Sequence, residues 1–121
     1  MIIRDFLEWV ENAADEPRAA AAGALTRVWL YSELTAEERQ MASAAMTFLL
    51  DDPCPDVRKA MAEGLSDSPD APRHIVLSLA EDVEQVAEVI LETSPVLSET
   101  ELVDALAKGS TRIQTAIAGR E

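Results

Sequence analysis

Apolar residues recur at helical spacing through the first fifty residues of the chain. Over residues 2–14 they lie three or four positions apart, which predicts an amphipathic helix. Its apolar positions are Ile2, Ile3, Phe6, Leu7, Trp9, Val10 and Ala13. Asp15-Glu16-Pro17 ends this helix and begins an Ala-rich helix over 18–31, because proline and acidic residues suit a first helical turn.

A capping box predicts the next helix, which runs from Thr35 to about Leu50. The Thr35 hydroxyl can accept a hydrogen bond from the third amide of the helix, and Glu38 can reach back to the Thr35 amide. The residues expected to face inward are Met41, Ala45, Phe48 and Leu49. This helix and the one before it can pair as an antiparallel hairpin.

Beyond this hairpin the predicted helices are shorter and turns separate them at regular intervals. They cover about 56–65, 71–80, 83–92, 98–108 and 113–118. Asp56 and Asp70 are the expected N-caps of the first two. Ser98 and Glu101 form a second capping box, and Gly109 suits the left-handed residue that ends a helix.

A sequence repeat accounts for this regular punctuation. A shift of 26 residues superposes Asp56, Val57, Leu65, Ser68 and Pro69 on Asp82, Val83, Leu91, Ser94 and Pro95. A shift of 27 carries Val86 and Ile90 onto Ile113 and Ile117. A period of two short helices is typical of stacked repeats, in which no unit buries its apolar face alone. An irregular helical bundle is the alternative.

The composition agrees with an all-α fold. The chain has 121 residues, which suits one domain, and it contains 20 alanines but only 4% aromatic residues. Such a composition favours helix over sheet. We therefore expect a single all-helical domain over 1–121, with N-terminal helices over 1–50 and helical repeats of about 26–27 residues over 51–121.

Several spaced segments carry a family resemblance. They are Asp56-Val57-Arg58, the run from Leu65 to Val76, the run from Ser94 to Ser98 with Leu102 and Val103, and Gln114 with Ala116 to Arg120. Over roughly residues 25–120 the chain resembles an alphaproteobacterial family catalogued as domain of unknown function 2336. The resemblance implies antiparallel helix pairs stacked as a HEAT-like, right-handed α-solenoid of the leucine-rich-variant kind, with the N-terminal helices packing on the first repeat. It implies no activity and brings no catalytic residues.

In this family the repeat pattern continues after the Ile-Ala-x-Arg segment, whereas the sequence here ends at Glu121. We therefore expect the chain to be the N-terminal part of a longer protein; a short natural paralogue is the alternative. In the first case the face of Ile113 and Ile117 should be exposed and should favour dimerisation.

The net charge of −13 restricts the classes of partner. Nucleic acids and anionic membranes are both bound through Lys and Arg, and the chain has no Lys or Arg between Arg73 and Lys108. A protein partner with a basic surface would be attracted instead.

Cysteine content and apolar runs indicate a cytoplasmic protein. Cys54 is the single cysteine and cannot form an internal disulfide. The start of the chain is charged at Arg4 and Asp5, where a signal peptide would be apolar, and no apolar run reaches the about 18–20 residues of a membrane span.

One acidic helix face is the candidate binding site for a protein. Glu84, Glu88 and Glu92 follow one another at four-residue steps with no basic residue between them, and Asp82 precedes them. Like charges in this spacing are mildly unfavourable, and a basic partner would relieve them. A solvated face that aids solubility is the alternative.

The remaining candidates favour structural roles, so we expect no catalytic, metal or cofactor site. His74 is the only histidine and is expected at the surface, and Cys54 is expected to be partly buried in an acidic turn that disfavours a thiolate. The acidic residues of that turn lack the glycine and closing glutamate of a calcium-binding loop. Trp9 shares a face with Phe6 and is expected in the core.

These observations favour a non-enzymatic protein-interaction module, a scaffold or adaptor with an acidic binding surface and no cofactor. A homodimerisation unit of a longer protein is the alternative. A third hypothesis is a HEAT-like DNA-repair enzyme, because glycosylases that this fold resembles use an acidic residue and tryptophans. Those enzymes work in a basic groove, which this acidic sequence does not predict.

Overall fold

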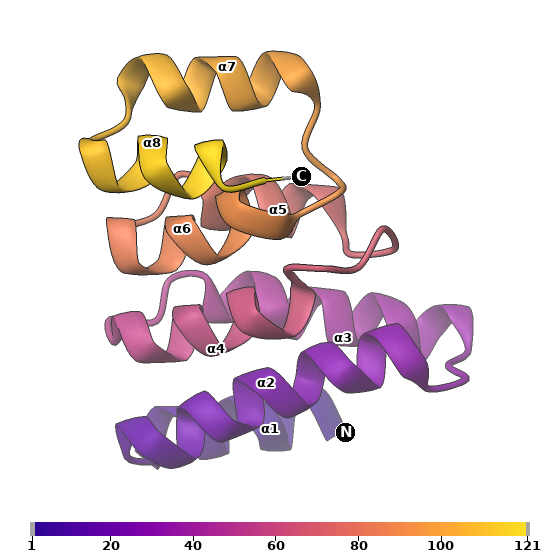
Figure 1. Ribbon diagram of the computed structural model, residues 1–121. Helices are drawn as coiled ribbons and strands as arrows, with labels where there is room; N and C mark the ends of the chain where they lie inside the picture. Colours follow the sequence, from indigo (N-terminus) through magenta and orange to yellow (C-terminus); the bar gives the residue numbers. More distant parts are fainter. Residues whose placement is uncertain (1, 121) are drawn as a thin grey trace.

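The computed structural model describes residues 2–120, with side chains for residues 4–120. These residues form eight α-helices and no strand, which confirms the all-α class (Figure 1). In chain order the helices are α1 (Ile2–Asn12), α2 (Asp15–Tyr31), α3 (Ala36–Leu49), α4 (Pro55–Leu65), α5 (Arg73–Ala80), α6 (Glu84–Thr93), α7 (Glu99–Lys108) and α8 (Thr111–Ala118).

The even-numbered helices form a continuous packed row. α2 packs on α4, α4 on α6 and α6 on α8. The odd-numbered helices flank this row: α3 contacts α1, α2 and α4, α5 contacts α4 and α6, and α7 contacts α8. Figure 1 shows the helix pairs following one another in chain order from the indigo end to the yellow end. This succession is compatible with a helical repeat.

Aliphatic and methionine side chains fill the interfaces of the row. The large residues with no exposed surface are Met46, Leu49, Val57, Met61, Leu65, Ile75, Val76, Leu79, Val86 and Ile90. Most of them come from α4, α5 and α6, because α4 and α6 are covered on two sides by the helices before and after them. Burial of this apolar surface is the main stabilising contribution to the fold.

The expected inward positions of two aromatic residues are wrong. Trp9 and Phe48 are each 44% exposed. On α3 the buried residues are Ala45, Met46 and Leu49, and Phe48 lies roughly 100° around the helix axis from the centre of that stripe. On α1 the buried residue is Val10, and the ring of Trp9 beside it is tilted by 38° to that of Phe6, with ring centroids 6.3 Å apart. The side chains of Ile2 and Ile3, expected on the same face, lie outside the described residues.

Both predicted capping boxes are confirmed, whereas both predicted aspartate caps are wrong. Thr35 with Glu38 and Ser98 with Glu101 each form the reciprocal pair of hydrogen bonds that caps α3 and α7. The N-caps of α4 and α5 are Cys54 and Pro72, and neither side chain makes a cap hydrogen bond. Proline explains the first shift: its fixed φ lets Pro55 begin α4 one residue before the predicted cap, Asp56. In the second case the N-cap, Pro72, lies two residues beyond the predicted cap, Asp70.

Gly109 ends α7 without the left-handed conformation that the sequence predicted. Its φ and ψ are −79° and 158°, and no residue in the described range 2–120 has a positive φ. The glycine is instead required by close packing. A Cβ at this position would lie 2.7 Å from the Ala105 carbonyl oxygen and 2.6 Å from a methyl carbon of Ile113.

Some positions related by the predicted repeat have similar surroundings in the structure, and others do not. Ser68 and Ser94 are both buried, and each accepts a hydrogen bond from the amide two residues later (3.1 and 3.2 Å). At the helix starts the 26-residue shift fails, since Val57 is fully buried whereas Val83 is 49% exposed at the N-cap of α6.

The 27-residue shift relates four buried residues. Val86 and Ile90 of α6 and Ile113 and Ile117 of α8 are all buried. The expectation that the face of Ile113 and Ile117 would be exposed is therefore wrong, because α8 turns this face onto α6.

A glycine sets the distance between α2 and α4. A Cβ at Gly64 would overlap the Thr26 hydroxyl and lie 2.9 Å from its Cβ. Thr26 is fully buried, and its hydroxyl donates a hydrogen bond to the Gly23 carbonyl oxygen at 2.7 Å. The two helices therefore approach each other more closely than a side chain at position 64 would allow.

We predict that Gly64→Ala destabilises the protein by about 1–3 kcal/mol, because the added methyl group forces α2 and α4 apart. The loss should appear although alanine favours an isolated helix by about 1 kcal/mol over glycine. Gly119→Ala is the matched control, since a Cβ there meets nothing closer than 3.5 Å. Urea unfolding followed by circular dichroism measures both; an equal stability of the two variants would contradict the close packing.

Candidate functional site

Two arginine–aspartate pairs connect successive parts of the helix row. Arg18 on α2 donates from Nε and Nη2 to the two carboxylate oxygens of Asp52, at 3.0 Å each. Arg58 on α4 donates in the same way to Asp82, at 2.8 and 3.0 Å. Each aspartate also accepts a backbone amide hydrogen bond at the N-cap of the following helix, from Cys54 (2.9 Å) and from Val83 (2.7 Å). The two pairs therefore make equivalent contacts in the turn before α4 and in the turn before α6.

The Asp52 carboxylate is kept ionised by its partners. Its burial disfavours the charged form, but the hydrogen bonds from Arg18 and from the Cys54 amide outweigh this effect. The pKa of Asp52 is consequently lower than the usual value for aspartate.

The four acidic residues predicted to bind a protein are not a single uncompensated patch. Asp82 is paired with Arg58 and is largely buried, with 12% of its side chain exposed. Glu88 accepts a hydrogen bond from Arg112 Nε of α8 at 2.7 Å, and this bond lowers the pKa of Glu88 below its ordinary value. Glu84 and Glu92 are exposed. The helix α6 itself contains no basic residue, but α8 supplies Arg112, which is 24 residues beyond Glu88 in the sequence.

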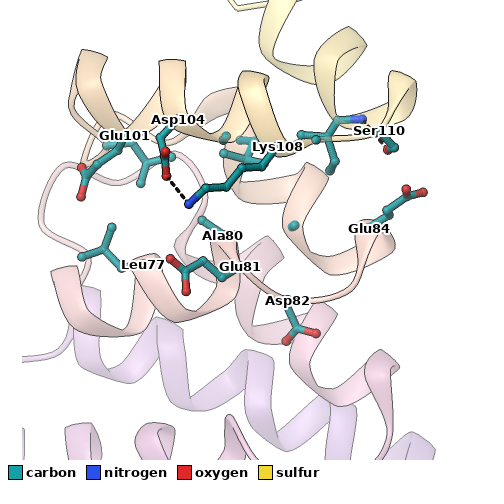
Figure 2. A pocket seen from close by; sticks show the side chains of 15 residues that line it. Leu77, Ala80, Glu81, Asp82, Glu84, Glu101, Asp104, Lys108 and Ser110 are labelled. Carbon is teal, nitrogen blue, oxygen red and sulfur yellow. Dashed lines mark hydrogen bonds and ion pairs between the residues drawn. The ribbon is translucent and has the colours of Figure 1, made fainter.

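A pocket of about 520 Å³ lies between α5, α6, α7 and α8 (Figure 2). Apolar residues of all four helices and of the turn before α7 line it: Leu77, Ala80, Ala87, Leu91, Leu97, Ala105 and Ile113. Five carboxylates border it: Glu81, Asp82, Glu84, Glu101 and Asp104. The volume is within the about 300–1,000 Å³ of typical ligand pockets. We take this acidic pocket as the candidate functional site.

Lys108 is the one basic residue that lines the acidic pocket. Its Nζ donates to Asp104 Oδ2 at 2.9 Å, and Figure 2 shows the side chain extending from α7 into the space above Glu81. The hydrogen bond with Asp104 raises the pKa of Lys108, and the charge of Glu81 contributes a smaller increase. The Lys108 ammonium group therefore stays charged beside the carboxylates of Asp104 and Glu81.

The sequence pattern found part of this pocket. Asp82 and Glu84 were predicted as binding residues and line it, whereas Glu88 and Glu92 do not. The charged residues missed are Glu81, Glu101, Asp104 and Lys108. The i,i+4 spacing of Asp104 and Lys108 signalled their ion pair, but not the pocket that they border, because the pocket depends on how α5 and α7 are placed.

The remaining candidate residues have ordinary surroundings. His74 is exposed, as predicted, with Nε2 at 3.3 Å from the Thr47 hydroxyl, and Cys54 is half-buried, as predicted. Within residues 4–120 no cluster of three or more His, Cys, Asp or Glu side chains has an arrangement that could hold a metal ion. Among the helices described for residues 2–120, none has the length and apolarity that crossing a bilayer requires.

Trp29 and Tyr31, the two remaining aromatic residues, lie near the end of α2. Trp29 is half-buried beneath the Arg39 guanidinium, which lies 4.8 Å from the ring centroid and donates to the Trp29 carbonyl oxygen at 2.9 Å. Its indole N–H is buried without a hydrogen-bond partner. Tyr31 is 74% exposed. None of these residues lines the acidic pocket.

No family model matches the chain, and no curated protein or solved structure matches it either. The resemblance to domain of unknown function 2336 therefore stays a prediction.

We predict that Asp52→Asn lowers the free energy of unfolding by about 1–3 kcal/mol at neutral pH, because a charged partner of Arg18 is lost. The pKa of Asp52 is depressed in the folded chain. The carboxylate of Asp52 therefore contributes its full stabilisation above its pKa in the unfolded chain, about 4. This stabilisation is lost as the pH falls through the lower pKa of the folded chain. The stability difference between wild type and Asp52→Asn should narrow below about pH 4.

Urea unfolding at several pH values measures this difference. The control is Asp67→Asn, because Asp67 is exposed on the turn between α4 and α5. A difference between wild type and Asp52→Asn that is the same at pH 7 and at pH 3 would show that the carboxylate charge contributes nothing.

Proposed function

We propose that the chain is a non-enzymatic protein-interaction module, a scaffold or adaptor that acts in the cytoplasm and binds a basic surface of a partner protein. The proposed architecture is a HEAT-like right-handed stack of helix pairs over 51–121, with the helices of 1–50 packed on the first pair. The binding surface is the acidic surface of α5 to α8. Stacked helix pairs commonly present such extended surfaces to proteins.

The observation that carries this proposal is the acidic pocket, which combines an apolar base with a carboxylate border. Protein interfaces commonly have an apolar centre, into which the partner inserts an anchoring side chain, and a polar or charged rim. A phosphate backbone or an anionic lipid surface would be repelled by the same carboxylates. The proposal therefore favours a basic protein over nucleic acid or membrane.

The orientation of the basic side chains adds to this support. Seven of them contact acidic side chains or backbone carbonyl oxygens of their own chain: Arg18, Arg39, Arg58, Arg73, Lys108, Arg112 and Arg120. The electrostatic potential at the surface is therefore set by exposed carboxylates such as Glu84 and Glu92 and is negative. A negative potential speeds the association with a basic partner.

We predict that the double variant Glu84→Lys/Glu92→Lys weakens binding of the partner by about tenfold at low salt, because two attractive charges become repulsive. Asp82 and Glu88 are left unchanged, since they hold Arg58 and Arg112. The measurement is affinity capture from lysate of the source organism at low and high salt, followed by calorimetric titration of the identified partner.

The matched control is Glu8→Lys/Glu11→Lys on α1, which changes the net charge equally at the other end of the helix row. A partner that binds both double variants equally well, or binds independently of salt, would contradict an acidic binding surface on α5 to α8.

A homodimerisation unit is the second candidate function, because α7 has an unpartnered outer face. Val103 is 63% exposed there and lines an open hollow of about 480 Å³ with Leu102 and Leu106. This alternative predicts a mass that doubles with concentration in light scattering, and a loss of the dimer in Val103→Arg but not in Val83→Arg, which is also exposed. A mass that stays monomeric at all concentrations would eliminate it.

A further inference from the structure

The acidic pocket already binds one cation, which belongs to the chain itself. The Lys108 ammonium lies at the pocket between the wall formed by α7 and the wall formed by α5 (Figure 2). Its ion-pair partner is Asp104, one turn earlier on the same helix, and both side chains are well exposed (76% and 62%). An exposed pair of this kind is weak, so another cation can replace it at little cost.

Some carboxylates around the pocket are paired within the chain, whereas others are not. Asp82 is held by Arg58, and Glu101 is held by Arg73 and by the Ser98 amide. Within the described residues, Glu81 and Glu84 make no hydrogen bond or ion pair through their side chains. The groups available to a ligand are therefore Glu81, Glu84 and, once Lys108 moves away, Asp104.

The base of the pocket selects for an apolar group. Leu77, Ala80 and Ala105 are half-buried at the pocket, so part of their apolar surface still contacts water. Leu91 and Ile113, which also line the pocket, are already buried. An apolar side chain placed here would remove water from both sides of the contact, which is favourable by the hydrophobic effect.

We propose that this pocket receives a short segment of a partner protein in which one apolar side chain is flanked by lysine or arginine, and that a partner cation replaces Lys108 between Asp104 and Glu81. The proposal rests on the interaction function argued above and names the segment that this surface recognises. Lys108 acts as an internal competitor that lowers the affinity for every segment, so that only a segment with both positive charges and an apolar residue binds measurably.

A protein segment fits these groups better than a small cation does. The free carboxylates come from three elements: Glu81 follows α5, Glu84 begins α6 and Asp104 lies on α7. One small cation reaches only part of this set and leaves the apolar base in water. A segment with cations on either side of an apolar residue can contact the border and the base together.

The test uses the full chain and the blocked peptide Lys-Lys-Leu-Lys-Lys, titrated at low salt and followed by NMR shifts of backbone amides. We expect the shifts to concentrate at residues that line the pocket, such as Ala80, Ala105 and Ser110, and to be small on α1. Replacing leucine by alanine in the peptide should weaken binding about threefold, because less apolar surface is buried. Spermine tests the small-cation alternative.

The decisive variant is Lys108→Met, which keeps the apolar stem and removes the ammonium group. It should bind the leucine peptide about two- to fivefold more tightly, the amount expected from an exposed ion pair that no longer has to be broken. Arg4→Met is the matched control, since Arg4 is exposed on α1 and the net charge changes equally. A second variant, Ala80→Met, fills the pocket and should remove the difference between the leucine and alanine peptides.

The outcomes separate this inference from the proposed function. Peptide shifts spread over α1 to α3, equal affinity for the leucine peptide and spermine, or equal effects of Lys108→Met and Arg4→Met would each overturn the inference. In these cases a salt-sensitive partner bound elsewhere on the acidic surface would leave the general function intact. An absence of any peptide binding would also overturn the inference, and the capture experiment would then decide the function independently.

Discussion

The guanidinium of Arg58 connects the turn before α4 with the turn before α6, and two neighbouring helices of the row are joined through it. From α4 it donates to both oxygens of Asp82 in the turn before α6, and also to the backbone carbonyl oxygen of Asp52 in the turn before α4. Asp52 in turn holds Arg18 of α2. A chain of charged hydrogen bonds therefore runs through three successive helices of the row. Removal of one member would leave a largely buried charge unpaired, which is far more costly than the loss of a surface ion pair.

The same use of arginine explains why the outer surface is so acidic. Arg39 and Arg120 donate to the backbone carbonyl oxygens of Trp29 and Leu91, in the last turns of α2 and α6. Arg73 donates to the Val96 carbonyl oxygen in the loop before α7. Helix ends leave such acceptors unsatisfied unless another group caps them. Seven of the ten basic side chains are occupied by contacts within the chain. Most exposed carboxylates of the described residues therefore have no basic side chain paired with them, and the surface is strongly acidic.

Local features of the fold were predictable from the sequence, whereas features that depend on distant partners were not. The capping boxes at Thr35 and Ser98 are complete within four residues, so the sequence contains all of their determinants. The cap at Asp56 failed because a neighbouring proline began the helix first. The position of Phe48 failed because helical spacing gives a stripe of apolar residues but does not say which edge of the stripe a neighbouring helix covers.

The candidate site shows the same division. Glu84 and Glu92 were found because spacing alone puts acidic residues on one helix face. The pairing of Glu88 with Arg112 spans 24 residues and has no local signal. The acidic pocket is formed by side chains from four helices, and its existence depends on α5 and α7 remaining apart. Such a property appears only when the helices are placed in space.

The weak attachment of α7 has a consequence for how any ligand would be detected. α7 contains no buried residue, although it forms one wall of the acidic pocket. Segments with so few buried contacts open locally with a free energy well below that of global unfolding. A ligand that binds only the closed form raises this local free energy by mass action, in proportion to the logarithm of its concentration. Occupancy of the pocket would therefore slow amide hydrogen exchange in α7, and it would stabilise the whole chain by the same free energy, because the globally unfolded chain lacks the pocket as well.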